Sequence, residues 1–284
     1  MGAGSSKKKK VTSRCVYYDG SDAFLAALEP VLLREPGRHS FMFGIVHNCE
    51  EFHGFGVYRG DELVLVAIQT PPRPLVAGTV GSHEVSKDEV ALLIDEVAAN
   101  DLVLPGINAD VAVAEMIAAE HAYRSGQLYE EDIHLNLYAL DSSPESTGGE
   151  LRAPTEAELP LVNRWVSEFY AEVIHEPDRA CPAMGVGEMP SLALWVVDGA
   201  PVSMLQFVLP TPASTMVTHV YTPPDNRGKG YATGMVAAAA AKAVQDKGLI
   251  CLHAHAANPA SNQVYRTVGF DQLLVRALYY FKLP

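Results

Sequence analysis

The sequence Val220-Tyr-Thr-Pro-Pro-Asp-Asn-Arg-Gly-Lys-Gly-Tyr-Ala232 decides the fold of this chain. It reads as the end of an apolar strand, a proline turn, and a glycine-rich bend that opens an alanine-rich helix. The first backbone N–H groups of a helix lack intrahelical partners, and the helix dipole favours negative charge there. Gly228 and Gly230 remove side chains where a ligand must approach the backbone. The stretch therefore predicts a binding site for a phosphorylated ligand.

The spacing of the glycines excludes two common phosphate-binding loops. Gly228-Lys-Gly-Tyr does not supply the G-x-x-x-x-G-K-[ST] pattern, and Thr233 stands where the dinucleotide fingerprint needs its third glycine. The stretch Arg227-Gly-Lys-Gly-Tyr-Ala232 fits R-x-x-G-x-A instead. A second motif follows, Asn258-Pro-Ala-Ser-Asn-Gln-Val-Tyr265-Arg-Thr-Val-Gly-Phe270.

Together the two motifs resemble the GCN5-related N-acetyltransferase (GNAT) superfamily, whose members bind acetyl-coenzyme A (acetyl-CoA). The resemblance extends over residues 151–284. It implies the acyl-CoA N-acyltransferase fold, an α/β fold with a mixed sheet whose two middle strands splay apart to admit the pantetheine arm. The first half shows comparable alternation of elements without the bend, so it resembles a degenerate copy, as in tandem-domain family members. At the corresponding place, Leu104-Pro-Gly-Ile-Asn-Ala-Asp110 leads into a helix without the motif.

A chain of 284 residues accommodates one large or two medium domains. Residues 141–149 are polar and rich in turn formers, and they are the best candidate for a boundary. We therefore expect a basic leader at 1–14, a degenerate GNAT-like domain at 15–140, a linker at 141–149 and a complete acetyltransferase domain at 150–284.

The resemblance implies which residues hold acetyl-CoA as cosubstrate. Backbone N–H groups from Gly228 to Ala232 would bind the diphosphate, Arg227 and Lys229 would add positive charge, and Asn258 would contact the pantetheine arm. A solvated charged turn is the alternative for the two cations, and a plain helix start is the alternative for Asn258. The expected binding set is Val220, Tyr221, Thr222, Arg227, Gly228, Lys229, Gly230, Tyr231, Ala232, Asn258 and Ser261.

Acyl transfer from a thioester to an amine needs a proton acceptor and a proton donor. A lysine-type amine has a pKa of about 10.4, so it must lose a proton, and a free thiol has a pKa of about 8.5. Tyr265 suits the donor because a phenol stays protonated at neutral pH, and its position matches the family tyrosine that faces the thiol. A tyrosine that merely packs against the sheet is the alternative.

Several residues compete for the role of the base. The strand before the bend carries no carboxylate, whereas family members often place a glutamate there. His219 has a suitable intrinsic pKa, although strand alternation places it with Tyr221 on one face, and core packing is the alternative for that face. Glu168 and Glu172, on an earlier helix, could also reach the acceptor. We rank His219 first and Glu168 second.

The formal net charge is −13, although Lys7–Lys10 and Arg14 make the first 14 residues basic. An acidic body argues against nucleic-acid binding, which needs a basic face. It suits a cationic small-molecule amine as acceptor, with solubility alone as the alternative explanation.

Cysteine and histidine spacings give no metal or disulfide framework. No C-x-x-C pair occurs, which favours free thiols and a reducing, cytoplasmic location, with disulfides between distant cysteines as the alternative. His253 and His255 share one face of a predicted strand, but no further ligands stand at suitable spacing, so we expect no metal. The cysteines are Cys15, Cys49, Cys181 and Cys251.

The leader has a pattern of its own. Met1-Gly2-Ala-Gly-Ser-Ser6 fits the myristoylation motif, and Lys7–Lys10 follow it directly. One acyl chain binds membranes only marginally, so an adjacent polybasic run is the usual second signal. Peripheral membrane contact through Gly2 and the lysines is one interpretation. A disordered solubilising leader, or a segment left by an expression vector, is the other.

These patterns predict an acetyl-CoA-dependent N-acetyltransferase that transfers an acyl group to the primary amine of a small molecule by direct attack in a ternary complex. Two alternatives from other classes stay open. One is a catalytically weak acyl-CoA-binding sensor or scaffold, which the missing strand carboxylate would allow. The other is a membrane-tethered adaptor.

Overall fold

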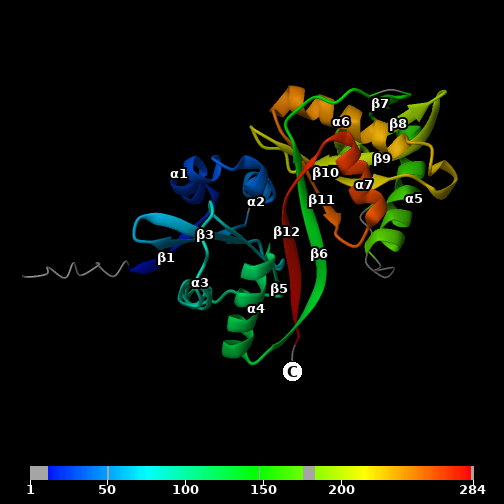
Figure 1. Ribbon diagram of the computed structural model, residues 1–284. Coiled ribbons are helices and arrows are strands. Elements are labelled where there is room, and N and C mark those ends of the chain that lie inside the picture. The colour runs from blue at the N-terminus through cyan, green and yellow to red at the C-terminus, as the bar shows by residue number, and fades with distance from the viewer. Residues whose placement is uncertain (1–11, 50, 147, 175–182, 283–284) are drawn as a thin grey trace, which may run out of the picture. The chain divides into compact units, whose positions relative to one another are not determined.

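The structure is a computed structural model that describes residues 12–49, 51–146, 148–174 and 183–282 (Figure 1). The chain forms two compact units, and each is assembled from separate stretches of sequence. Unit 1 takes its residues from 1–34, 49–133 and 276–284, and unit 2 from 35–48 and 134–275.

Unit 1 is built on a sheet with the strand order β1-β2-β3-β4-β5-β12. Adjacent strands are antiparallel except β4 and β5, which are parallel. The strands are β1 (Ser13–Asp19), β2 (His53–Arg59), β3 (Glu62–Gln69), β4 (Leu75–Thr79), β5 (Gly106–Asp110) and the C-terminal part of β12 (Asp271–Lys282). The helices are α1 (Ser21–Leu32), α3 (Lys87–Ala99) and α4 (Val111–Ser125).

The core of unit 1 lies between its sheet and the helices α3 and α4. Val90, Leu93, Ile94 and Val97 of α3 recur at the spacing of one helix face, and all four are buried. Helix α3 begins with a capping box, a reciprocal pair of hydrogen bonds between the Ser86 and Glu89 side chains and backbone.

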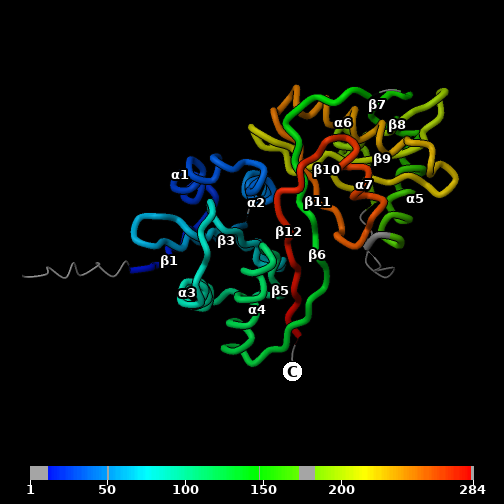
Figure 2. Tube along the Cα trace, in the orientation of Figure 1, coloured from blue at the N-terminus to red at the C-terminus, as the bar shows by residue number. Residues whose placement is uncertain are grey.

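Unit 2 has a sheet with the order β6-β11-β10-β9-β8-β7, in which only β10 and β11 are parallel. Figure 2 shows β6, in green, running beside β11. The strands are β6 (Leu128–Leu140, from residue 134 on), β7 (Glu150–Arg152), β8 (Leu192–Val197), β9 (Ala200–Val208), β10 (Thr215–Tyr221) and β11 (Ile250–His255). The helices are α2 (Pro36–Asn48), α5 (Leu159–Phe169), α6 (Tyr231–Lys247) and α7 (Pro259–Val268).

Two apolar clusters hold the helices of unit 2 on its sheet. Alanines of α6 allow close approach to Trp195, Leu205 and Leu252 of the sheet. Val162 and Trp165 of α5 pack in a second cluster with strand residues from β8, β9 and β10. The sheet therefore carries α5 and α6 on separate cores.

The two sheets follow the same plan. In each, strands follow in chain order, the fourth and fifth are parallel, and the last place is taken by a strand from the other half of the sequence. Residues 135–140 of β6 precede the predicted linker, yet they pair with β11 of unit 2. Residues 276–280 of β12 lie in the last strand of the sequence, yet they pair with β5 of unit 1. The domain boundaries at 15–140 and 150–284 stay a prediction that truncated chains can test.

The predicted fold class is confirmed: the chain forms α/β units on mixed sheets. One detail was wrong. By the order of elements, the connection in unit 1 that corresponds to the glycine bend lies between β4 and α3, at residues 80–86. The stretch Leu104–Asp110 instead contains β5, a short strand whose apolar content is too small to distinguish it from a turn in sequence. No helix in the described part of the chain has the length and apolar character of a bilayer span.

Candidate active site

Strands β10 and β11 separate at their C-terminal ends. They pair from Thr215 opposite Ile250 only as far as Val217 opposite Leu252, although each strand continues for several more residues. Where a parallel pair stops, backbone N–H and C=O groups on the facing edges lose their partners and become available to a ligand. The family resemblance implied this splaying, and the structure shows it beside the bend.

Strand β10 also carries a bulge at His219. The register against β9 shifts between Thr218 and Tyr221, and His219 has a φ of 50°, in the left-handed region. Val217 and Val220 pack in the same apolar cluster although they are three positions apart, an offset that puts side chains on opposite faces of a regular strand. The bulge therefore directs Tyr221 to the core beneath α5.

The bend itself leaves the N-terminus of α6 open. Gly228 and Gly230 have φ angles of 75° and 78°, and no side chain in the described ranges caps the helix that Gly230 begins. A Cβ placed on either glycine would meet no atom of the described residues within 4 Å. Among the described residues, the N–H groups of Tyr231, Ala232 and Thr233 have no acceptor. This arrangement fits an anion such as a diphosphate.

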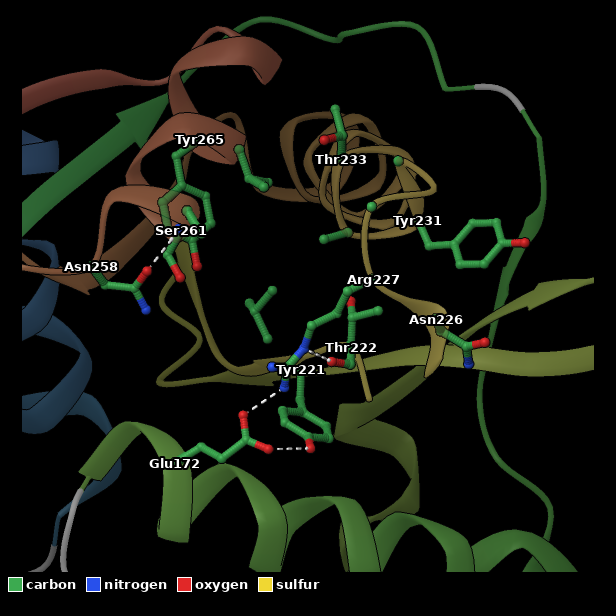
Figure 3. Close-up of a pocket in the computed structure, with 16 residues that line it drawn as sticks. Glu172, Tyr221, Thr222, Asn226, Arg227, Tyr231, Thr233, Asn258, Ser261 and Tyr265 are labelled. Carbon is green, nitrogen blue, oxygen red and sulfur yellow. Dashed lines mark hydrogen bonds and ion pairs between the residues drawn. The ribbon is translucent and has the colours of Figure 1, made fainter. Parts of the chain in front are cut away.

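A pocket of about 520 Å³ lies between the bend, the splayed end of β10 and the start of α7 (Figure 3). Every residue predicted to hold the cosubstrate lines it except Lys229, whose ammonium donates a 2.9 Å hydrogen bond to the Asp225 carbonyl. The lining residues that the sequence did not suggest are Asn226, Thr233, Ala260 and Val264. They are neighbours of the two motifs in sequence, so their proximity to the motifs was the available signal.

Asn258 begins α7. Its Oδ1 accepts a 3.1 Å hydrogen bond from the Ser261 N–H, so its side chain caps the helix. No partner of its amide nitrogen is found among the described residues, and Asn258 lines the pocket. The helix-start interpretation is therefore seen in the structure, and it leaves the amide nitrogen available to a ligand.

Tyr265 lines the pocket from α7 and is only 5% exposed. Its ring lies 5.7 Å from that of Tyr138 and 6.0 Å from that of Phe270, measured between ring centroids. In the described part of the chain its hydroxyl makes no hydrogen bond. Burial, and to a lesser extent Tyr138, raises the pKa of Tyr265 above its ordinary value. The phenol is therefore protonated at neutral pH.

His219 does not line the pocket. It is 8% exposed, its ring lies 5.1 Å from Phe169 and 5.6 Å from Tyr170, and its Nδ1 lies 3.0 Å from the Gln206 Oε1. Burial lowers the pKa of His219 to about 4. The structure therefore does not bring His219, the first-ranked base, together with Tyr265, because the imidazole is buried against Phe169 and Tyr170.

Two carboxylates surround one hydroxyl at the edge of the pocket. The Tyr221 hydroxyl lies 3.1 Å from the Glu168 Oε2 and 3.0 Å from the Glu172 Oε1. It has a single proton, so it donates to one carboxylate at a time. Burial and then the hydrogen bonds to Glu172 and Glu168 raise the pKa of Tyr221. The hydroxyl therefore stays neutral between the two acids.

Glu172 is the acid that reaches the pocket, whereas Glu168 does not line it. It sits on the π-helical turn Tyr170–Ile174 that follows α5, a type of turn frequent at functional sites. Its Oε2 accepts a 2.5 Å bond from the Arg227 guanidinium, as the dashed lines in Figure 3 show. Glu168 and Glu172 are four residues apart on helical structure, which was the sequence signal for their pairing.

No group of three or more His, Cys, Asp or Glu side chains is placed to hold a metal ion within the described ranges. The two histidines of β11 have other contacts: the His253 ring packs at 5.0 Å against Phe41, and the His255 Nδ1 accepts from the Ala257 N–H.

The splayed sheet and the open helix end together define an acyl-CoA-type acyltransferase fold, and comparison with known proteins agrees. Residues 159–270 match the model of the acetyltransferase (GNAT) family. No curated protein sequence matches the chain significantly.

Several solved structures share the fold over nearly the whole chain. A Drosophila protein is 8% identical and covers 96% of this chain and 99% of its own, with a TM-score of 0.65. A GCN5-related N-acetyltransferase from Sphaerobacter thermophilus is 14% identical, covers 96% of both chains and has a TM-score of 0.54. A GNAT-family acetyltransferase from Colwellia psychrerythraea is 12% identical and covers 94% of this chain and 99% of its own, with a TM-score of 0.52.

The segment that forms the pocket thus belongs to the GNAT superfamily, and the chain is an acyltransferase. The fold likeness extends over both units, since the structures of the Drosophila, Sphaerobacter and Colwellia proteins each match more than nine-tenths of the chain.

Proposed function

We propose that this chain is an acetyl-CoA-dependent N-acetyltransferase that acylates the primary amine of a small molecule by direct attack in a ternary complex. One observation carries the proposal: the unpaired N–H groups of the glycine bend and the buried Tyr265 hydroxyl line a single pocket. The N–H groups would bind the diphosphate of the cosubstrate, and the Tyr265 hydroxyl would serve the leaving thiol at its other end.

Backbone N–H groups and charged side chains would both contribute to binding the coenzyme. The N–H groups between Gly228 and Ala232 would hold the diphosphate, with Arg227 and Lys229 supplying positive charge. The splayed edge of β10 and the free amide nitrogen of Asn258 would hydrogen-bond the amides of the pantetheine arm. The open space in front of both glycines supports this fit, because a diphosphate needs to approach the backbone closely.

The reaction would remove two protons from an ammonium acceptor and give one proton to sulfur. A carboxylate takes the first proton, directly or through one water, and passes it to solvent. The neutral amine nitrogen then attacks the thioester carbonyl carbon, the carbon–sulfur bond breaks, and the sulfur takes the Tyr265 proton. The nitrogen loses its second proton as the amide forms, and that proton restores the phenol. Glu172 is the favoured acceptor because it lines the pocket, with Glu168 behind it on the same hydroxyl.

A catalytically weak sensor is the second candidate. The pocket would bind an acyl-CoA in either case, but β10 carries no carboxylate and its histidine is buried with a pKa of about 4. Release of thiol in the presence of an amine separates the two candidates.

The basic leader supports a proposal about where in the cell the protein acts. The myristoylation motif at Gly2 and the run Lys7–Lys10 lie outside the described residues, and the sequence alone supports peripheral membrane contact for an otherwise cytoplasmic enzyme. Mass spectrometry of natively expressed protein tests this, because an unmodified Gly2 would exclude the lipid.

Calorimetry with acetyl-CoA and CoA, followed by a thiol-release screen of polyamines, amino acids, aminoglycosides and peptide N-termini, tests the main proposal. We expect binding and release with at least one class of amine. Tyr265→Phe should then lower turnover by roughly 10²-fold or less without weakening CoA binding. Unchanged turnover across the pH range would remove the acid role from Tyr265, and no binding heat at millimolar ligand would overturn the whole proposal.

A further inference from the structure

We infer that Glu172 competes with the diphosphate of the coenzyme for Arg227, so that coenzyme binding releases the Glu172 carboxylate to receive a cationic acceptor amine. The inference rests on the proposed function and deepens it: it assigns a substrate charge and an order of binding to the same pocket.

The Arg227–Glu172 ion pair lies across the pocket that the cosubstrate would enter. The guanidinium Nη2 and the Glu172 Oε2 are 2.5 Å apart, and both residues line the pocket. Their side chains are 49% and 41% exposed, so water screens the pair and another anion can exchange for the carboxylate. A diphosphate carries more negative charge than one carboxylate, and the helix N-terminus beside Arg227 adds to its attraction.

Arg227 can change partners without leaving the bend. Its Nε donates a 2.9 Å hydrogen bond to the Thr222 carbonyl, and its guanidinium lies 5.7 Å over the Tyr221 ring. These two contacts hold the side chain in place while the outer nitrogen that binds Glu172 faces the pocket. Exchange therefore requires only a small movement of the guanidinium tip.

Release of Arg227 changes the charge around Tyr221. Glu172 loses the cation that neutralises it, and Glu168 stays on the same hydroxyl with only a 3.8 Å contact to Arg164. Two carboxylates then face one neutral phenol, an arrangement that attracts a cation. The buried Tyr265 hydroxyl, which has no partner among the described residues, lines the same pocket and marks its reacting end. The acceptor would thus be an ammonium-bearing molecule that binds after the coenzyme.

The test measures CoA affinity by calorimetry in Glu172→Gln, which keeps the shape of the side chain and removes its charge. We expect CoA to bind roughly twofold to fivefold more tightly than to the unaltered protein at low salt, since exposed pairs contribute little. The gain should shrink at 0.5 M salt, about where screening weakens exposed pairs. A purely structural role for Glu172 would weaken binding instead.

Glu168→Gln is the matched control, because Glu168 shares the Tyr221 hydroxyl but does not contact Arg227. Its CoA affinity should equal that of the unaltered protein. In thiol-release assays Glu172→Gln should also raise the KM for a cationic amine at saturating acetyl-CoA.

The outcomes distinguish the inference from the proposed function. CoA binding by the unaltered protein with equal or weaker binding by Glu172→Gln overturns the inference alone. No CoA binding by the unaltered protein overturns the proposed function and the inference with it. Glu172→Asp, which keeps the charge but withdraws it from Arg227, is a second variant that should shift CoA affinity in the same direction.

Discussion

Helices α3 and α6 occupy the same place in the order of elements of their units, but their N-termini are capped differently. At α3 the Ser86 N–H donates to Glu89 at 2.9 Å, and the Glu89 N–H donates back to the Ser86 hydroxyl at 3.3 Å. Glu89 is buried and also accepts 2.7 and 2.8 Å bonds from Arg59. At α6, Gly230 stands in place of the capping serine, and no side chain from the part of the chain that the structure describes caps the helix end.

The difference shows how one fold can serve stability in one unit and binding in the other. A helix end that its own side chains cap is stabilised, and it offers an anion fewer free donors beside a carboxylate that repels it. An uncapped end behind two left-handed glycines is less stable and keeps its donors for a ligand. By this criterion the proposed coenzyme site belongs to unit 2, because among the described residues α6 has the uncapped end and α3 the capped one.

The largest effect is expected from shortening the chain. Residues 150–284 lack β6, whose Tyr138 and Leu140 belong to the core beneath α6. Without that core we expect α6 and its glycine bend to lose their structure. The fragment should therefore show no cooperative thermal unfolding by circular dichroism and no CoA binding.

The matched fragment is 128–284, which retains β6 and should preserve more of both properties. Cooperative unfolding and CoA binding by residues 150–284 alone would contradict this expectation and support the domain boundaries predicted from sequence.

A side chain on the bend should break the binding function of α6. Gly230→Val places a branched side chain in the open space that the diphosphate would enter, and CoA affinity by calorimetry should fall by at least about 100-fold, or about 2.7 kcal/mol. Gly248→Val is the control, because Gly248 ends the same helix with a φ of 81° and an equally open environment. Both variants should lose similar stability, and equal loss of CoA affinity would remove the bend from the site.

The cap of α3 should matter for stability alone. Glu89→Gln leaves Arg59 without its buried carboxylate, and we expect the free energy of unfolding to fall by about 2–3 kcal/mol with CoA affinity unchanged. Asp88→Asn, an exposed change in the same turn, is the control and should cost only a few tenths of a kcal/mol.

The same variant gives a pH test with a definite sign. Arg59 first, and then Ser86, hold the pKa of Glu89 at about 2, below its ordinary value of 4.5. A depressed pKa in the folded state contributes stability that is complete above pH 4.5 and is lost as the pH falls towards 2. Urea unfolding should therefore show the gap between Glu89→Gln and the unaltered protein narrowing below pH 4.5. A difference in unfolding free energy that stays constant down to pH 2 would show that Glu89 stabilises unit 1 by its packing and not by its charge.

The smallest effect is expected from giving α6 part of the α3 arrangement. Thr233 is the third residue of α6, the position that Glu89 holds in α3, and it lines the pocket. Thr233→Glu should weaken CoA binding by roughly threefold to tenfold, because a carboxylate in the first turn competes with the diphosphate for the same donors. Thr233→Gln supplies the control without charge, and CoA should bind to it as it does to the unaltered protein.

The bend and the second motif were readable from sequence because their chemistry is local. Two glycines between a strand and an alanine-rich helix, and an Asn-Pro start with a tyrosine further along, determine their own backbone geometry within a few residues. The pocket residues follow from these motifs, since neighbours in a tight turn stay neighbours in space.

The features that the sequence did not reveal all depend on distant partners. Strand alternation placed no bulge at His219, since the register shift depends on pairing with β9. Arg227 and Glu172 form an ion pair although more than fifty positions separate them in sequence, and β6 pairs with the distant strand β11. Both pairings are visible only in the folded chain. Periodicity shows that a segment is a strand and is silent about its neighbour.

The pairing of β12 with β5 has a consequence for synthesis of the protein on the ribosome. Residues 276–280 are made long after β5, so the β5 edge stays open while the residues between them are synthesised. At 5–20 residues per second, that delay after β5 lasts roughly ten to thirty seconds. An exposed strand edge of this kind invites wrong pairing, so nascent unit 1 is exposed to that hazard until β12 has been made.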